Sequence, residues 1–237
     1  FRSWVPPLLR GCRHVLTNSQ FTAREIQRCT GLPDSRITVI PLGCEADVFC
    51  PASAPPGTRG DPYLLHVGQA YPHKNLRRLI QAFAALAPSY PGLQFILAGK
   101  PHPQETPRLK ALVAELGLQA RVEFRSYVPY TELPDLHRDA LALVYPSLWE
   151  GFGLPVLEAM ACGTPVITSA GSGTEEVAGD AALLVNPRRT AAIEDSLRLI
   201  CQNSQLRDQL RTAGLRRASQ FSWARTGART AEVLQGL

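Results

Sequence analysis

The chain has 237 residues, of which 45% are hydrophobic and 19% charged, and its formal net charge is +5. These proportions are those of a globular chain with a buried core, and they exclude a disordered tail, a collagen-like repeat and a coiled coil. No apolar run reaches the roughly 18 residues that a membrane-spanning helix needs, so we expect no transmembrane segment.

The first 45 residues predict one strand–helix unit and a second strand. The first residue is Phe1 rather than Met and no leader-like segment follows it, so we expect the chain to be part of a longer protein. Residues 46–61 are rich in Pro, Ala and Gly and lack periodicity, which is typical of a linker. The elements expected before this linker are the end of a helix over 1–11, a strand over 12–17, a helix over 20–30 and a strand over 37–40.

From residue 62 onward, strand-like runs alternate regularly with helical segments. Strands are expected at 63–67, 94–98, 122–124, 141–145, 165–168 and 182–185. Helices are expected at 75–87, 106–117, 130–139, 155–162, 174–178, 190–202, 204–218 and 222–235. Several strand runs are apolar throughout, as buried parallel strands are. The alternation predicts an α/β fold with a Rossmann-like, doubly wound parallel sheet, which binds ligands beyond the carboxyl ends of its strands.

The loop that follows the strand at 141–145 is expected to form an anion site. Pro155 suits the first helical position, where its missing N–H costs nothing. We therefore expect free N–H groups around Val156 and Leu157 at the positive end of the helix dipole, an arrangement that binds anions.

The same loop and the helix after it hold two glutamates. Glu150 precedes the helix and Glu158 lies about one turn into it, and residues 151–153 between them read Gly-Phe-Gly. Two glutamates at a bare spacing are usually ordinary exposed acids. Glycines let the backbone approach a ligand closely, and at the carboxyl end of a strand this pattern favours a ligand site in which one carboxylate contacts a group beside the anion.

Two further loops are candidates for phosphate contacts. Lys74 is one of only three lysines and follows the strand at 63–67, and Asn75 can cap the next helix. A flexible point charge there suits a phosphate, although an ordinary surface lysine fits equally well. The loop at 169–176 is rich in Gly and Ser, but its position does not fit a dinucleotide fingerprint, which disfavours an NAD enzyme.

The positive charge is concentrated near the C-terminus. Residues 188–237 hold nine arginines, no lysine and four acidic residues, which accounts for the whole net charge of +5. Solvated terminal helices explain this most simply, and peripheral contact with an anionic membrane surface is the alternative. No aromatic-interleaved basic stretch points to nucleic acid. The six cysteines form no CxxC pair and have no metal-ligand spacing, which favours reduced thiols and a cytoplasmic protein. If the basic region contacts a membrane, the protein would be peripheral at the inner face of that membrane.

As a set, these motifs resemble family 4 of the retaining glycosyltransferases, which have the GT-B architecture. PSLWEGFGLPVLEAMACGTPVI resembles the family signature almost letter for letter, and VGQAYPHKNLRRLIQAF is similar to its diphosphate loop. TNSQFTAREI and ITVIPLGCEADVF are similar to the region that joins the two GT-B domains. The resemblance implies a remnant of the N-terminal domain at 1–45, a linker at 46–61 and a donor-binding domain at 62–237.

The resemblance also implies residue roles. Lys74 would contact the donor diphosphate, Glu158 would hold the ribose hydroxyls, and Glu150 would be the catalytic residue beside the transferred sugar. His73 stands where the family often has Arg, so neutralisation of the diphosphate is expected to be weaker or to come from another arginine. Backbone groups would contact the sugar, the β-phosphate and the base, and the remaining donor-binding residues are Gly68, His73, Tyr127, Val128, Phe152, Gly153 and Leu154.

The implied activity is transfer of a sugar, with retention, from a nucleotide-diphosphate donor to a glycan or lipid-linked acceptor, without cofactor or metal. Similarity to bacterial mannosyltransferase-like members favours a GDP-sugar over a UDP-sugar. In this family the acceptor site lies in the N-terminal domain, of which only the last unit is present, so we expect this chain to bind donor without transferring it. The alternative is a non-catalytic nucleotide-sugar-binding module or an inactive fragment. An epimerase is disfavoured by the Glu-x7-Glu run, and a phosphorylase by the lack of a cofactor lysine site.

Overall fold

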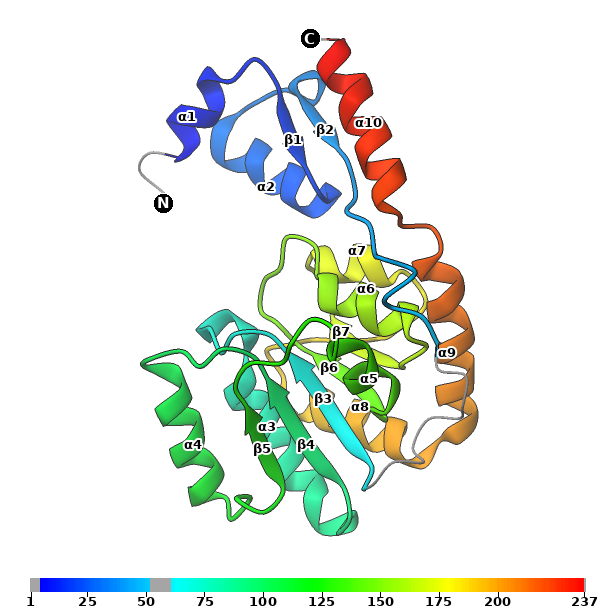
Figure 1. The fold of residues 1–237 in the computed structure, drawn as a ribbon. Helices are drawn as coiled ribbons and strands as arrows, with labels where there is room; N and C mark the ends of the chain where they lie inside the picture. The colour runs from blue at the N-terminus through cyan, green and yellow to red at the C-terminus, as the bar shows by residue number, and fades with distance from the viewer. Residues whose placement is uncertain (1–4, 52–60, 237) are drawn as a thin grey trace.

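The structure is a computed structural model that describes residues 5–51 and 61–236. Residues 1–4 of the first expected helix and residues 52–60 of the expected linker lie outside the described residues. The described chain forms a small N-terminal unit and a larger α/β unit (Figure 1). None of the described helices is long and apolar enough to cross a membrane.

The N-terminal unit has two short parallel strands with a helix between them. Strand β1 (Val15–Thr17) pairs with β2 (Ile37–Val39). The other elements of this unit are α1 (Val5–Gly11), α2 (Gln20–Thr30) and the 3-10 turn η1 (Asp34–Arg36). The predicted order of helix, strand, helix and strand is therefore confirmed, although both strands are shorter than expected.

The larger unit is built on a six-stranded parallel sheet with the order β5-β4-β3-β6-β7-β8. Its strands are β3 (Tyr63–Val67), β4 (Gln94–Ala98), β5 (Val122–Arg125), β6 (Ala142–Tyr145), β7 (Val166–Ser169) and β8 (Leu183–Val185). This is the common order of Rossmann folds, and the chain changes direction across the sheet between β3 and β6. The predicted fold class is confirmed.

Helices cover both faces of this sheet (Figure 1). Neighbouring strand residues point to opposite faces, and Leu64 and Leu65 are both fully buried, one in each of the two hydrophobic clusters. Burial on both faces explains why the strands read as continuous apolar runs rather than alternating ones. The covering helices are α3 (Leu76–Leu86), α4 (Glu105–Glu115), α5 (Leu133–Arg138), α6 (Leu154–Ala161), α7 (Gly173–Ala178), α8 (Thr190–Gln202) and α9 (Ser204–Ala218).

The last helix, α10 (Trp223–Gln235), lies beside the N-terminal unit rather than on the six-stranded sheet (Figure 1). The Thr226 hydroxyl donates to the backbone oxygen of Pro41 at 2.7 Å. A Cβ atom at Gly43 would lie 2.1 Å from the Trp223 backbone nitrogen, so only glycine allows this close approach. The helix thus contacts the first unit, although the predicted boundaries assign it to the second.

Part of the expected linker is packed against the larger unit. Phe49 is 2% exposed, and its ring lies edge-on to Tyr130 with 5.4 Å between the ring centroids. Arg138 on α5 donates to the backbone oxygens of Val48 at 3.1 Å and Cys50 at 2.7 Å. Residues 48–50 are therefore held beside α5.

Candidate functional site

The loops that carry Lys74 and Glu150 meet where the sheet order reverses, between β3 and β6. The loops after β3 and β6 run side by side, and the Leu148 N–H donates to the His73 backbone oxygen at 2.7 Å. The carboxyl ends of strands at such a switch point leave a crevice for ligands. Lys74 reaches this crevice from the 3-10 turn η2 (Pro72–Lys74), and Glu150 reaches it from the loop after β6.

Asn75 joins these loops instead of capping α3 with its side chain. It has a left-handed backbone (φ 62°), occupies the N-cap position and makes no side-chain capping bond, so the expected role is wrong. Its buried amide group instead donates to the backbone oxygens of Pro146 at 3.0 Å and Pro187 at 2.7 Å. Three loops are thereby tied together below the site.

Replacing Asn75 is expected to destabilise the fold. Asn75→Gly removes both hydrogen bonds of the side-chain amide. It should lower the free energy of unfolding by roughly 1–3 kcal/mol, because the buried carbonyl groups lose their donors. Asn75→Ala should cost about 1 kcal/mol more, since a Cβ disfavours the left-handed backbone. Urea unfolding of the two variants measures both effects, and equal stabilities of Ala and Gly would contradict the strain argument.

Lys74 and Glu150 form an ion pair in the crevice. Lys74 Nζ lies 2.7 Å from Glu150 Oε1, and the two side chains are only 12% and 13% exposed. The ammonium also donates to the Tyr145 hydroxyl and lies 4.7 Å from the centroid of that ring. Burial, followed by the Glu150 charge, raises the pKa of Tyr145 well above its usual value. The cation proposed for the diphosphate is therefore already paired with the carboxylate proposed for the sugar.

His73 lies at the edge of this pair. Its Nε2 is 3.9 Å from Glu150 Oε1, and its ring stacks on Tyr71 with 5.8 Å between the ring centroids. Partial burial lowers the pKa of His73, and the Lys74 charge adds to this effect while Glu150 opposes it. His73 therefore adds less positive charge near neutral pH than the arginine that the family often has there.

Helix α6 begins one residue earlier than expected, at Leu154, so Pro155 is its second residue rather than its first. The N–H groups of Val156 and Leu157 donate to the Gly153 backbone oxygen at 3.0 and 3.3 Å, so the expected free amides are not these. In the described part of the chain no acceptor binds the N–H groups of Phe152, Gly153 and Leu154. These three amides, which the resemblance implied, are the ones left for an anion.

Two glycines shape this helix start. Gly153 has a φ of 107°, and a Cβ there would lie 2.6 Å from Thr174 Cγ2. A Cβ at Gly173 would lie 2.3 Å from the Gly151 backbone oxygen, and the Gly173 N–H donates to the Glu150 backbone oxygen at 2.9 Å. The loop that carries Glu150 is thus packed directly on the start of α7.

Glu158 lies on α6, the helix that follows the Glu150 loop. Its side chain is 15% exposed, and its Oε2 lies 3.8 Å from Nε2 of the fully buried His137 on α5. The Glu158 charge contributes, after burial and Glu150, to raising the pKa of Tyr145. Both predicted glutamates therefore act on the same buried hydroxyl.

Gly68 and the residues expected to read the base lie at the carboxyl ends of two strands of the same sheet. Gly68 directly follows β3, and its N–H donates to the Ala98 backbone oxygen at 2.8 Å. Tyr127 and Val128 follow β5, with Tyr127 65% exposed and Val128 packed against the core. A cavity of about 80 Å³ beside Gly68 is lined by Lys100, Lys110 and other residues. The loops expected to hold a nucleotide thus all follow the carboxyl ends of strands in this sheet.

The sequence did not single out Tyr145 or His66 as parts of this site. His66 on β3 is fully buried and stacks on Tyr145, with 5.1 Å between the ring centroids and a 12° interplanar angle. Its Nδ1 donates to the Val144 backbone oxygen at 3.0 Å. Burial, as the main cause, lowers the pKa of His66 to about 4, so this ring is neutral under the Lys74–Glu150 pair at neutral pH.

The N-terminal unit contacts the site loop through the start of α2. The Ser19 and Thr22 hydroxyls both donate to the Gly151 backbone oxygen. The N–H groups of Gln20 and Phe21 donate to the Glu176 carboxylate at 2.9 and 3.1 Å. A carboxylate at a helix N-terminus is favourable, so Glu176 joins the two units beside Glu150.

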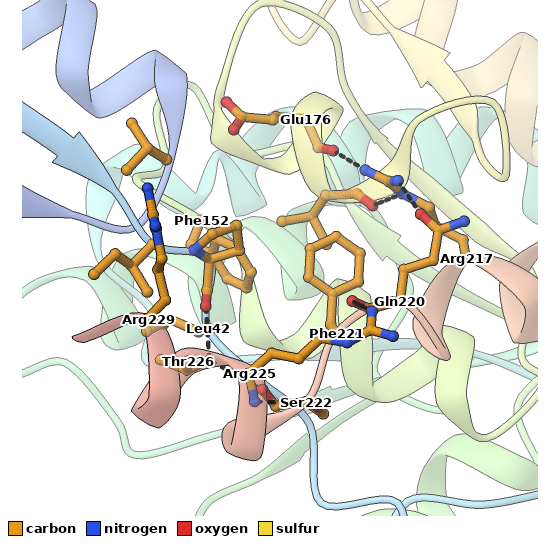
Figure 2. Close-up of a pocket in the computed structure, with 14 residues that line it drawn as sticks. Leu42, Phe152, Glu176, Arg217, Gln220, Phe221, Ser222, Arg225, Thr226 and Arg229 are labelled. Atoms are coloured by element: carbon orange, nitrogen blue, oxygen red, sulfur yellow. Dashed lines mark hydrogen bonds between the residues drawn. The ribbon is translucent and has the colours of Figure 1, made fainter. Parts of the chain in front are cut away.

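A larger pocket of about 450 Å³ lies behind this junction and shares only Phe152 with the predicted site (Figure 2). Arg217 lines it and donates to the Val177 backbone oxygen at 2.9 Å. It also donates to the Glu176 backbone oxygen at 2.7 Å, as Figure 2 shows. The pocket marks the place where β2, α7, α9 and α10 meet. It contains none of Lys74, Glu150 and Glu158.

Comparisons with known proteins show the family of this chain. The family model described as Glycosyl transferases group 1 matches residues 54–217. The chain is 36% identical over 224 residues to O-antigen chain mannosyltransferase B of Escherichia coli, a match covering 91% of this chain and 58% of that protein. It is 34% identical over 228 residues to D-inositol 3-phosphate glycosyltransferase of Nocardia farcinica, covering 90% and 50%.

Solved structures show the same fold. Sucrose-phosphate synthase of Thermosynechococcus elongatus superposes with a TM-score of 0.86 and 27% identity, covering 98% of this chain and 60% of that one. HepE of Anabaena, solved in complex with UDP and glucose, gives a TM-score of 0.89 at 22% identity, covering 100% and 66%. In the sequence comparisons above, the chain spans about half the length of the curated relatives it matches.

Proposed function

Because the chain belongs to the family of glycosyl transferases group 1, we propose that it binds the donor of a retaining glycosyltransferase, a nucleotide-diphosphate sugar. The observation that carries this proposal is the buried Lys74–Glu150 ion pair over Tyr145, a hydroxyl on which the Glu158 charge also acts, in the loop that leads to the free amides at the start of α6. A cation and a helix N-terminus together suit a diphosphate, and the two carboxylates suit hydroxyl groups on either side of it.

The proposed chemistry is positioning and electrostatic stabilisation. Lys74 and the amides of residues 152–154 hold the diphosphate and stabilise the charge that develops as it departs. Glu150 contacts the transferred sugar, and Glu158 accepts hydrogen bonds from the ribose. Backbone groups at Tyr127 and Val128 read the base. The proposed chemistry uses neither a cofactor nor a metal ion.

The donor is proposed to be a GDP-sugar, with a UDP-sugar as the second candidate. The resemblance to mannosyltransferase-like bacterial enzymes, which include the relative from Escherichia coli, supports the first. The Anabaena neighbour was solved with UDP and glucose, which is the reason for naming a UDP-sugar as the second candidate. The acceptor is proposed to be a glycan or a lipid-linked glycan. Peripheral membrane contact through the arginine-rich C-terminal region stays a prediction, and α10 offers it exposed Trp223 and Leu234.

The acceptor side of the cleft is proposed to come from residues outside this sequence, and the protein that includes them is called the complete enzyme here. Two short strands and two helices before residue 46 are too small to form a second cleft wall with its own core. Without that wall, water is not excluded and no acceptor is aligned with the donor.

The 237-residue chain is therefore expected to bind donor without turning it over. Incubation with GDP-mannose or UDP-glucose and a set of acceptor sugars should release no nucleotide above background. The complete enzyme is the positive control. Nucleotide release that follows the concentration of the 237-residue chain and disappears in Glu150→Gln would show that one wall suffices for the chemistry.

A further inference from the structure

His137 on α5 is a fully buried histidine whose ring has no hydrogen-bond partner. Neither Nδ1 nor Nε2 is paired within the described residues. A neutral imidazole carries one N–H donor, and burying such a donor without an acceptor costs free energy. Nearly all buried polar groups in folded proteins are paired, so this exception needs a reason.

The surroundings of His137 hold the ring in place. The Phe49 ring lies edge-on to it with 6.2 Å between centroids, and the Thr164 hydroxyl donates to the His137 backbone oxygen at 2.7 Å. The neighbouring Arg138 fixes the covering segment 48–50 through two backbone oxygens, at 3.1 and 2.7 Å. The imidazole is therefore closed off from solvent on the side of the linker.

On its other side the ring faces Glu158. His137 Nε2 lies 3.8 Å from Glu158 Oε2, and no hydrogen bond to this carboxylate forms among the described residues. A movement of the Glu158 carboxylate by roughly 1 Å brings its Oε2 to hydrogen-bond distance from Nε2. The Glu158 side chain is 15% exposed, so one of its oxygens can face His137 while the other faces the crevice.

We propose that His137 is a positioning residue for Glu158: its Nε2–H donates to Oε2 and thereby turns Oε1 toward the ribose hydroxyls of the donor. This inference rests on the proposed function, in which Glu158 binds the ribose. A carboxylate held by a buried donor is preorganised, and less rotamer freedom is lost when the ribose binds. The orphan donor of the imidazole then has its acceptor.

The test compares a nucleotide that has ribose hydroxyls with one that lacks them. Calorimetry gives the affinity of the 237-residue chain for GDP and for 2′,3′-dideoxy-GDP, and the ratio of the two dissociation constants is the readout. UDP and its dideoxy analogue replace them if UDP binds more tightly. If His137 only filled space, replacing it would change the stability of the fold but not this ratio.

The wild-type ratio should be at least about 10-fold, as expected for hydrogen bonds to a charged group, and Glu158→Ala should bring it close to 1. His137→Phe keeps the ring volume without the donor and should lower the ratio at least about threefold. His137→Gln restores an N–H and should stay within about twofold of the wild type. Thr164→Val, the matched control, removes the bond to the His137 backbone and should leave the ratio unchanged.

Three outcomes overturn the inference and separate it from the proposed function. A wild-type ratio in His137→Phe, together with a collapsed ratio in Glu158→Ala, rejects the role of His137 and leaves the ribose site intact. An equal loss in Thr164→Val shows that packing, and not the imidazole N–H, is responsible. An unchanged ratio in Glu158→Ala rejects the ribose site itself. Should His137→Phe fail to fold, His137→Leu takes its place in the same comparison.

Discussion

Glu150→Gln is expected to lower the turnover of the complete enzyme by about 10²–10³-fold, the usual cost of losing one group that stabilises a transition state. The same change should leave the affinity of the 237-residue chain for bare nucleoside diphosphate unchanged or higher. The reason is the 2.7 Å ion pair, because Glu150 competes with the diphosphate for Lys74. Removing the negative charge frees the ammonium for the ligand.

Steady-state kinetics and calorimetry test the two halves of this expectation separately. Glu232→Gln is a matched control, since it removes one negative charge from the exposed surface of α10. A loss of nucleotide affinity in Glu150→Gln would mean that Glu150 contacts the nucleotide itself. Normal turnover would remove it from the chemistry.

Lys74→Ala is expected to weaken nucleoside diphosphate binding by roughly 1.5–3 kcal/mol, or about 10- to 150-fold, as loss of a charged hydrogen bond does. Binding of the nucleoside alone should change much less, because it has no phosphate for Lys74 to contact. Lys74→Met gives the same comparison with the aliphatic stem retained against Tyr145. Arg108→Ala is the control, since it removes one exposed cation from α4.

The ion pair makes this prediction testable by a double-mutant cycle. Lys74→Met leaves the Glu150 carboxylate without its cation, and an unpaired carboxylate repels a diphosphate. Combining Lys74→Met with Glu150→Gln should therefore recover part of the lost affinity. Equal losses for nucleoside and nucleoside diphosphate, measured by calorimetry, would remove Lys74 from the diphosphate site.

The sequence predicted the fold because its signals were local. Strands buried on both faces read as apolar runs, and glycines and prolines marked the turns between elements. It also predicted that the loop with Glu150 follows a strand and leads into the helix that carries Glu158, and their role in ligand binding stays a prediction. The register of α6 was one residue off, because Pro is tolerated at either of the first two helical positions, and this moved the free amides to residues 152–154.

Other features depend on contacts that a sequence does not display. Tyr145 and His66 read as ordinary strand residues, and only the pairing of β3 with β6 brings them beneath Lys74. Asn75 resembled a helix cap, but its amide found acceptors in two distant loops. The amphipathic pattern of α10 shows that one face is apolar, and it does not show which unit that face contacts.

We propose above that this chain holds a nucleoside diphosphate at Lys74, Glu158 and the first amides of α6 without a metal ion. In the described residues, no three His, Cys, Asp or Glu side chains converge in a way that suits a metal ion, and Lys74 with the α6 amides is proposed to neutralise the phosphates instead. The most direct measurement is a calorimetric titration of the 237-residue chain with GDP and with UDP, each in the presence of EDTA and then of excess Mg²⁺. We predict saturable one-to-one binding of at least one nucleotide with the same affinity in both buffers. Binding of neither nucleotide, or binding only with Mg²⁺, would contradict metal-independent binding of the diphosphate.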